Sequence, residues 1–161
     1  MSAAEPRIRR AREEDAYDIV SWFPDRRAAV MWGGPQVADP LVAQWLMGEF
    51  NAPGRDYYVM VGLDDEPLGV FGLRLHPREK RAHLIRVAIQ PFARGYGLSS
   101  ALLKGAAILA QQSRMERLTL NVYGSNDQAR MAYERAGFFP YEFAPAPEDP
   151  SGAIVRMLRP L

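Results

Sequence analysis

The sequence predicts an α/β protein in which helices pack on a mixed sheet. Short segments with the alternation of strands are interspersed with longer segments whose apolar residues recur at helical spacing. Glycine and proline residues mark most of the borders between them. The predicted order of elements is βααβββαβαββ, and an order of this kind places helices on a sheet. A chain of 161 residues favours a single domain, expected over residues 1–161.

The first half of the chain is expected to form a strand, two helices and a hairpin. Pro24 ends the first helix. Pro40 suits the first turn of the second helix. The segment Trp32–Pro35, with the sequence WGGP, is predicted to be a loop because of its Gly-Gly-Pro content. The predicted bounds are 6–11 for the strand, 12–23 and 40–50 for the helices, and 57–63 and 67–75 for the two strands of the hairpin.

The second half alternates strands and helices. In the second of its helices, Ser125 and Gln128 match a capping box at the start, and Gly137 stands where a left-handed C-terminal cap belongs. A proline-rich loop joins the last two strands. The predicted bounds are 82–90 for a strand stopped by Pro91, 98–112 for a helix, 118–123 for a strand, 125–137 for a helix, and 138–143 and 153–158 for the last strands.

The composition excludes several classes of protein. The chain has no cysteine and only two histidines, which removes thiolate catalysis and makes a cysteine or histidine metal site unexpected. Its net charge of +1 comes from scattered basic residues, so no nucleic-acid surface is expected. No apolar run approaches the ~18 residues of a membrane span, and the N-terminus lacks the apolar region of a signal peptide. We therefore expect a cytoplasmic protein with no metal and no membrane partner.

The segment RGYGLSS, residues 94–100, lies between a buried-looking strand and an amphipathic helix. The first amides of a helix have no internal acceptor, and the helix dipole places about half a positive charge there. A pyrophosphate would satisfy several of these amides, and Gly95 and Gly97 would let its oxygens approach the backbone. On the seven residues alone, an ordinary tight turn without ligand explains the segment equally well. A P-loop is excluded because the pattern G-x-x-x-x-G-K-[ST] is absent.

Two segments together resemble the GNAT superfamily of acetyl-CoA-dependent N-acetyltransferases. The first is VAIQPFARGYGLS, which resembles the family's strand followed by Q/R-x-x-G-x-G/A, with Ser99 in place of the last small residue. The second is LNVYGSNDQARMAYERAGF, which resembles the family's N-x-x-A-x-x-x-Y-x-x-x-G-F. The resemblance implies the GNAT-like acyl-CoA N-acyltransferase fold, acetyl-CoA as co-substrate and an amine as acceptor.

The resemblance also implies a set of residues that hold coenzyme A. The backbone of the preceding strand would pair with the pantetheine arm, much as an added strand pairs with a sheet edge. Asn126 would hydrogen-bond the cofactor, although asparagine is also favoured at a helix start for its own sake. The residues expected at the cofactor are Val87, Ala88, Ile89, Arg94, Gly95, Tyr96, Gly97, Leu98, Ser99, Ser100 and Asn126.

By the same resemblance, Tyr133 would donate a hydrogen bond to the departing thiolate, because a tyrosine with a pKa near 10 is protonated at neutral pH. Out of context, a packed core tyrosine would be the better interpretation. Many family members carry a glutamate at positions that hold His83 and Asn121 here. His83 is a candidate general base, although a hydrogen-bonded core or edge histidine is the favoured interpretation. Asn121 is a candidate for positioning a water or the acceptor.

The acceptor side is less defined. Trp32 is a candidate acceptor contact because an aromatic residue beside two glycines often lines a cleft. Glu148 and Asp149 lie in the loop 145–152, where a solvated acidic loop is favoured over a site for a cationic amine.

The sequence thus predicts an acetyltransferase in which an amine, either a small molecule or a protein N-terminus, attacks acetyl-CoA directly. The alternative is a non-catalytic acyl-CoA-binding or protein-interaction module on the same fold. Exposed terminal strands make a homodimer an open expectation.

Overall fold

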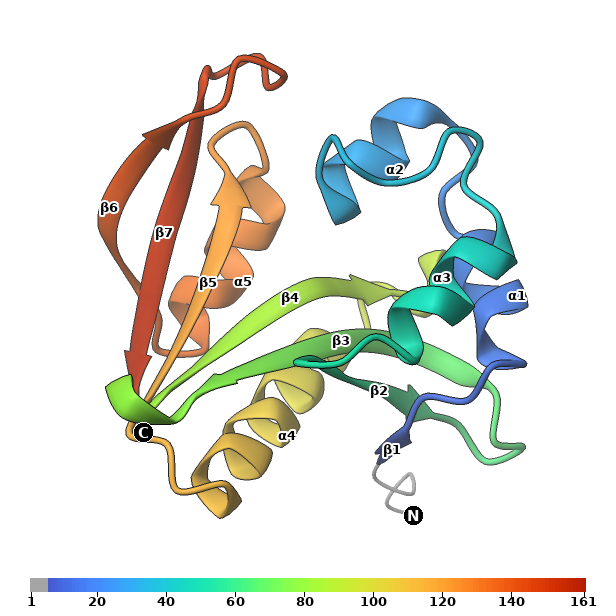
Figure 1. The fold of residues 1–161 in the computed structure, drawn as a ribbon, viewed down its shortest axis with the longest axis horizontal. Helices are drawn as coiled ribbons and strands as arrows, with labels where there is room; N and C mark the ends of the chain where they lie inside the picture. Colours follow the sequence, from blue (N-terminus) through green and yellow to red (C-terminus); the bar gives the residue numbers. More distant parts are fainter. Residues whose placement is uncertain (1–5) are drawn as a thin grey trace. The chain divides into compact units, whose positions relative to one another are not determined.

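Residues 6–161, which the computed structural model describes, form a mixed sheet with α-helices and two short 3-10 turns (Figure 1). The elements in chain order are β1 (Arg7–Arg10), α1 (Asp15–Val20), α2 (Arg26–Gly33), α3 (Ala43–Phe50), β2 (Asp56–Val61), β3 (Pro67–His76), η1 (Pro77–Glu79), β4 (Arg81–Ile89), η2 (Pro91–Ala93), α4 (Leu98–Gln112), β5 (Arg117–Tyr123), α5 (Asp127–Arg135), β6 (Phe139–Pro145) and β7 (Ala153–Pro160).

The seven strands follow the order β1-β2-β3-β4-β5-β7-β6. β4 and β5 are parallel, whereas the pairs β1–β2, β5–β7 and β6–β7 are antiparallel. Parallel neighbours need a long crossover, and α4 supplies it between β4 and β5. The predicted fold class, a mixed sheet with helices packed on it, is confirmed.

The chain divides into two compact units. The first contains the described residues up to Gly72 together with Arg86–Leu102, and the second contains Leu73–Ile85 together with Leu103–Leu161. β3, β4 and α4 each contribute residues to both units. That the chain forms one domain stays a prediction.

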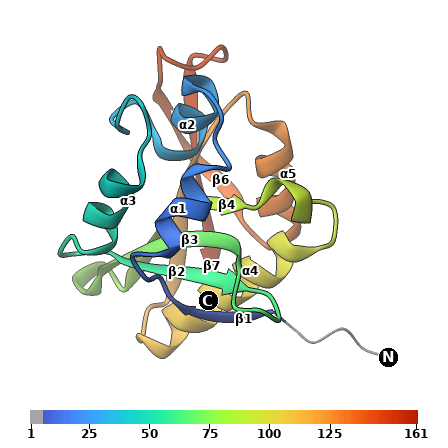
Figure 2. The same ribbon diagram turned by 90° about the vertical axis from the view of Figure 1, so that its right-hand side faces the viewer.

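In the first unit, α1 and α3 contact each other and lie near the antiparallel pair of β1 and β2 (Figure 2). The core of this unit forms because alternate residues of the strands and the apolar faces of the helices turn inward. Its fully buried side chains include Ile19, Leu46, Tyr57, Val59 and Phe71.

In the second unit, β5, β7 and β6 form an antiparallel ribbon (Figure 1). The alternation predicted for β5 is incomplete: Leu118 and Leu120 are buried and Asn121 is exposed, but Thr119 between the two leucines is buried as well. The helix α5 ends as predicted: Gly137 has a φ of +96°, and the N–H of Phe138 donates to the carbonyl of Tyr133 at 3.0 Å.

The start of α5 differs from the prediction. Asn126, not Ser125, is the N-cap, and its Oδ1 accepts from the N–H of Ala129 at 3.2 Å. The hydroxyl of Ser125 donates instead to Asp149. A distant carboxylate, which no local pattern reveals, has taken the hydroxyl that the capping box would have used.

The helix α2 was not predicted. Asp25 caps it by accepting from the N–H of Ala28 at 2.8 Å, so the helix begins seven residues before Gly33. Trp32 and Gly33, predicted to be loop, therefore form its last turn, and Gly34 follows with a φ of +90°. Three helices instead of the predicted two thus separate β1 from β2 in the described part of the chain.

Candidate active site

The segment between β4 and α4 has the geometry of an anion site. Gly95 and Gly97 have φ values of +89° and +72°, which L side chains rarely adopt. The first helical hydrogen bond of α4 runs from the N–H of Ala101 to the carbonyl of Gly97 at 3.4 Å. The N–H groups of residues 98–100 come before this bond. As at any helix start, they have no acceptor within the helix and are available to a ligand or to water.

The space around these glycines suits a ligand. A Cβ built on Gly95 or on Gly97 would meet no atom within 4 Å, so both positions border open space. Tyr96 between them is 78% exposed. The guanidinium of Arg94 lies close to the strand, where its Nε donates to the carbonyl of Ile89 at 3.4 Å. This segment, residues 94–100, fits a phosphate-bearing ligand and is called the cradle below.

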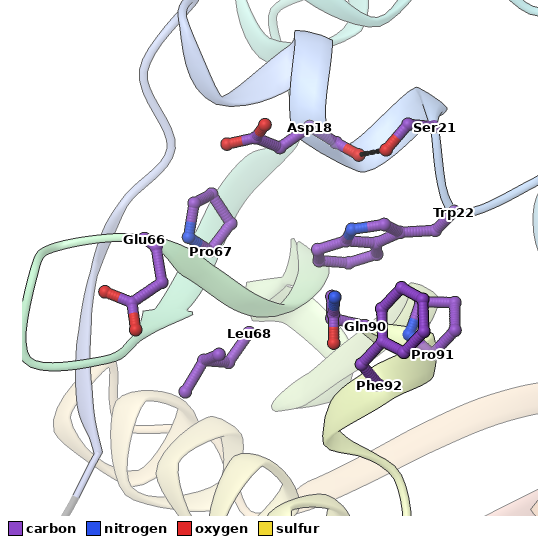
Figure 3. Close-up of a pocket in the computed structure, with 9 residues that line it drawn as sticks. All are labelled: Asp18, Ser21, Trp22, Glu66, Pro67, Leu68, Gln90, Pro91 and Phe92. Carbon is purple, nitrogen blue, oxygen red and sulfur yellow. Dashed lines mark hydrogen bonds between the residues drawn. The ribbon is translucent and has the colours of Figure 1, made fainter.

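A cleft of about 320 Å³ lies beside η2, the turn that leads into the cradle. Figure 3 shows the indole of Trp22 above Gln90 and close to the rings of Pro91 and Phe92. Phe92 is 90% exposed. The full lining is Asp18, Ser21, Trp22, Glu66, Pro67, Leu68, Gln90, Pro91 and Phe92. The cleft gives the first unit a partly apolar surface immediately before the cradle.

Arg86 is the centre of a buried cluster in the first unit. Its Nη1 donates to Glu49 Oε1 at 2.8 Å and to the hydroxyl of Tyr57 at 2.7 Å, and its guanidinium lies over the ring of Trp45. Burial raises the pKa of Tyr57 above its usual value, with Arg86 acting in the opposite direction. Tyr57 therefore stays protonated. Its neutral hydroxyl accepts a hydrogen bond from Arg86, and the carboxylate of Glu49 supplies the charge opposite to the guanidinium.

Trp32 lies in this neighbourhood rather than in a free loop. Its ring stacks on that of Phe23 with centroids 4.3 Å apart. Its indole N–H donates to the backbone carbonyl of Arg86 at 2.9 Å. The one polar atom of the side chain is thus engaged within the protein, so any acceptor contact would use the remaining face or edge of the ring.

In the second unit, Tyr133 lies on α5 with its side chain buried and its ring edge-on to that of Phe138, 5.9 Å away. Burial raises the pKa of its hydroxyl above the usual value of about 10. The hydroxyl is therefore protonated at neutral pH and can donate a hydrogen bond. Complete transfer of its proton to a thiolate, whose conjugate acid has a pKa of about 8.5, is correspondingly unfavourable.

His83 is held by a neighbouring strand. Its Nδ1 lies 2.8 Å from Thr119 Oγ1, and Arg81 Nη1 donates to the same oxygen at 3.0 Å. Burial, followed by the nearby positive charge of Arg81, lowers the pKa of His83 to about 4. The imidazole is then neutral and a weak base.

Asn121 shares the sheet face of this histidine. His83 and Thr119 are direct partners across the parallel ladder, and Asn121 follows Thr119 by two residues, which places all three on one face. Asn121 is exposed and stands opposite Arg156 of β7. The structure thus brings the two sequence-predicted residues together as one polar patch.

The sequence favoured a solvated acidic loop at residues 145–152. The structure shows instead that both acidic side chains of this loop are hydrogen-bonded within the protein. Asp149 is buried and accepts from the N–H and the hydroxyl of both Ser125 and Ser151. Burial alone would raise its pKa, but these hydrogen bonds outweigh it, and the pKa is lowered. Glu148 accepts from the hydroxyl of Tyr123 at 2.8 Å. The loop is therefore fastened to the start of α5.

The predicted site residues fall into two groups. Those in the first unit are Trp32, Val87, Ala88, Ile89, Arg94, Gly95, Tyr96, Gly97, Leu98, Ser99 and Ser100. Those in the second unit are His83, Asn121, Asn126 and Tyr133. Asn126 uses its Oδ1 for capping, so a bond to a ligand would be donated by its Nδ2.

The cluster around Arg86 was missed by sequence reasoning. A signal was present, because Arg86 is a charged residue within the otherwise apolar run LIRVAI. A charge in the middle of such a run indicates a buried ion pair as readily as an exposed face. Its partners Glu49 and Tyr57 come from elements far away in the chain and carry no local signal.

Within residues 6–161, no helix combines the length and the apolarity needed to cross a membrane. The same part of the chain contains no group of three or more His, Cys, Asp or Glu side chains arranged to hold a metal ion.

Comparisons with known proteins agree with this architecture. The family model described as acetyltransferase (GNAT) family matches residues 11–138. A mycothiol acetyltransferase from Gordonia bronchialis is 32% identical over 132 residues, which are 81% of this chain and 40% of that protein. The chain therefore spans about two fifths of the length of this relative.

Solved structures share the fold. Spermidine N-acetyltransferase from Vibrio cholerae, in complex with CoA and spermine, superposes with a TM-score of 0.79 at 16% identity, covering 98% of this chain and 96% of that one. AAC(6')-Ib in complex with paromomycin and acetyl-CoA gives a TM-score of 0.75 at 18% identity, covering 97% of this chain and 93% of that one. The fold and the family model together define the class of this protein. The chain belongs to the acetyltransferase (GNAT) family.

Proposed function

We propose that the protein is an N-acetyltransferase that transfers the acetyl group of acetyl-CoA to a primary amine by direct attack in a ternary complex. The observation that carries this proposal is the cradle: two left-handed glycines with open space around them, immediately before the first free amides of α4. Backbone N–H groups at a helix start favour a pyrophosphate. Acetyl-CoA has one and supplies the activated acetyl group as a thioester.

The cofactor residues have separate tasks in this proposal. The amides of residues 95–100 hold the pyrophosphate. The backbone of residues 87–89 pairs with the amides of the pantetheine arm. Arg94 adds charge beside the cradle, and Asn126 donates from its Nδ2. Because these contacts use mainly backbone groups, the glycine conformation matters more than the identity of most side chains.

Two negative charges that develop during the transfer need to be stabilised, one on the carbonyl oxygen and one on the departing sulfur. The nitrogen lone pair of the amine attacks the thioester carbonyl, a C–N bond forms, and the C–S bond then breaks. A backbone N–H of residues 87–89 donates to the developing oxyanion. The hydroxyl of Tyr133 donates to the departing thiolate. The raised pKa of Tyr133 keeps this donor protonated, so that it acts by hydrogen bonding, with the proton reaching sulfur late or through water.

The role of His83 follows from its surroundings. With a pKa of about 4, its imidazole is too weak a base to deprotonate an alkylammonium ion effectively at neutral pH. We assign to the patch of His83 and Asn121 the positioning of the amine or of a water that carries its proton away. Orientation of this kind supplies several kcal/mol without a strong base.

The proposed class of acceptor is supported by two solved structures that share the fold. These two structures hold spermine and paromomycin, both of which carry amines. We therefore propose an amine acceptor for this chain. Trp32, through its ring, is proposed as a contact for it. A cytoplasmic location and a homodimer remain predictions.

A turnover assay with Tyr133→Phe tests the proposal. The variant keeps the packing against Phe138 and loses only the hydroxyl, so kcat should fall about 100-fold while acetyl-CoA still binds. The assay measures CoA release with a thiol reagent, to which this cysteine-free chain contributes no background. Spermidine, an aminoglycoside and a short peptide with a free N-terminus serve as acceptors.

Tyr141→Phe is the matched control, because Tyr141 is an exposed tyrosine of β6 in the same unit. Its kcat should equal that of the wild type. Equal rates for Tyr133→Phe and the wild type would contradict the assigned role of the hydroxyl. Acetyl-CoA binding without turnover on any amine would favour the alternative of a non-catalytic acyl-CoA-binding module.

A further inference from the structure

Arg86 has an unusual backbone conformation for its place in the fold. Its φ is +50°, although it lies inside β4. The other non-glycine residues with positive φ among the described residues are Asp65, Lys80 and Arg114, and all three lie outside strands and helices, in turns. A left-handed arginine within a strand persists only where the surroundings hold it, and such residues gather at functional sites.

The ladder between β4 and β5 ends just before this residue. The paired residues of β4 are Arg81–Leu84, and the next residue, Ile85, is no longer a partner of Asn121. The left-handed turn at Arg86 thus begins where the parallel pairing stops. The peptide that follows is oriented by something other than that ladder.

The carbonyl of Arg86 accepts from the indole N–H of Trp32 on α2 at 2.9 Å. In a trans peptide the carbonyl and the following N–H point in opposite directions. The N–H of Val87 therefore points away from Trp32. One hydrogen bond from an aromatic side chain defines the direction of the amide at the position where an oxyanion donor is proposed.

The side chain of Arg86 anchors the same turn from the other end. Only 7% of it is exposed, and it is held by Glu49 of α3 and Tyr57 of β2. Glu49 is itself held by Arg55 at 3.1 Å. All of these residues belong to the first unit, so the anchor and the turn form one body.

We infer that Arg86 and Trp32 are positioning residues: together they turn the peptide between Arg86 and Val87 so that the N–H of Val87 donates to the thioester carbonyl oxygen of acetyl-CoA. The inference rests on the proposed function. Neither side chain touches the reacting atoms. In the transfer, negative charge on that oxygen rises as the C–N bond forms and falls as the C–S bond breaks, and no proton moves to or from Val87.

The test uses acetyl-CoA labelled with ¹³C at the acetyl carbonyl and isotope-edited infrared spectra of the bound state. A hydrogen bond to the carbonyl lowers its stretching frequency, and the measurement needs no acceptor. Trp32→Phe keeps the stack on Phe23 and loses the N–H donor. Tyr17→Phe, which removes an exposed hydrogen-bond donor on α1 of the same unit, is the matched control.

The wild type and the control should show the band lowered relative to free acetyl-CoA, and Trp32→Phe should lose half of this shift or more. With an amine that is acetylated, kcat of Trp32→Phe should fall about tenfold, less than the roughly 100-fold expected for losing an oxyanion donor outright. Its dissociation constant for acetyl-CoA should remain within about twofold, since one hydrogen bond to the carbonyl is a small part of the ligand's contacts.

A second pair of variants separates the backbone from the ion pair. Arg86→Gly and Arg86→Val both lose the guanidinium, but only glycine adopts a φ of +50° freely. The lowering of the carbonyl stretching frequency should be larger in Arg86→Gly than in Arg86→Val. The inference is overturned if wild type binds acetyl-CoA and shows no lowered band, or if Trp32→Phe matches the control. Absence of acetyl-CoA binding to the wild type in calorimetry would instead overturn the proposed function, and the inference with it.

Discussion

Lowering the pH from 7.5 to 5 should destabilise the protein by about 2 kcal/mol through His83 alone. Burial and the positive charge of Arg81 lower the pKa of this histidine to about 4 in the folded state, against about 6.5 in an unfolded chain. Because the folded pKa is the lower one, the unfolded state binds more protons as the pH falls. Stability is therefore lost between about pH 6.5 and pH 4.

The magnitude follows from the two pKa values. At pH 5 the imidazole is about 97% protonated in the unfolded chain and about 9% protonated in the folded protein. Proton binding at pH 5 therefore favours the unfolded state over the folded state by a factor of about 30, which is equivalent to about 2 kcal/mol at 25 °C. The loss would approach about 3 kcal/mol below pH 4, where both states are largely protonated.

Urea unfolding at both pH values measures this loss. The loss of stability measured for the wild type includes the contributions of all groups that titrate between the two pH values. His83→Gln removes the contribution of His83 alone. The variant should therefore lose about 2 kcal/mol less than the wild type between pH 7.5 and 5. His76→Gln removes the other histidine of the chain, whose charge is a minor cause of the lowered pKa of His83, and should retain most of the wild-type loss. Equal losses for wild type and His83→Gln would refute the assignment of a buried, neutral imidazole.

Two further changes test the parts of the fold that position the site. Asp149→Asn leaves one oxygen for the donors of Ser125 and Ser151, so urea unfolding at pH 7 should show a loss of about 2 kcal/mol, against no change in Asp64→Asn, a control at an exposed aspartate of the β2–β3 turn. Because the pKa of Asp149 is lowered in the folded state, its contribution is present above about pH 4 and is lost as the pH falls through the folded value. Arg86→Met leaves Glu49 without one buried partner and should cost about 3 kcal/mol in the same assay, whereas a loss under about 1 kcal/mol would contradict the anchoring role.

The sequence predicted the regular elements well where local pattern decides them. The bounds predicted for α4, residues 98–112, are the observed ones. Its apolar face and the glycines before it are local signals, and the same holds for the turn at Gly137. The helix α2 was missed because the Gly-Gly-Pro segment was given more weight than Asp25, whose cap extends the helix through Trp32.

The parts that escaped prediction depend on distant partners. Nothing near Ser125 in the chain shows that Asp149 will take its hydroxyl. The left-handed turn at Arg86 requires Glu49, Tyr57 and Trp32, which are contributed by other elements. The patch of His83 and Asn121 was predicted as two residues, but its weak basicity arises from burial and from Arg81 and has no signature in a strand pattern.

The central claim is that residues 94–100 bind the pyrophosphate of acetyl-CoA, and calorimetric titration of the purified protein with acetyl-CoA tests it most directly. Gly97→Glu and Gly54→Glu are compared with the wild type, because both glycines have positive φ and open space around them in the first unit, but only Gly97 lies in the cradle.

The account predicts that wild type and Gly54→Glu bind with a dissociation constant in the micromolar range. Gly97→Glu should bind at least about tenfold more weakly, a difference of about 1.4 kcal/mol, because a carboxylate then borders the pyrophosphate. Absence of binding by the folded wild type, or equal binding by both variants, would contradict the claim and leave RGYGLSS an ordinary turn.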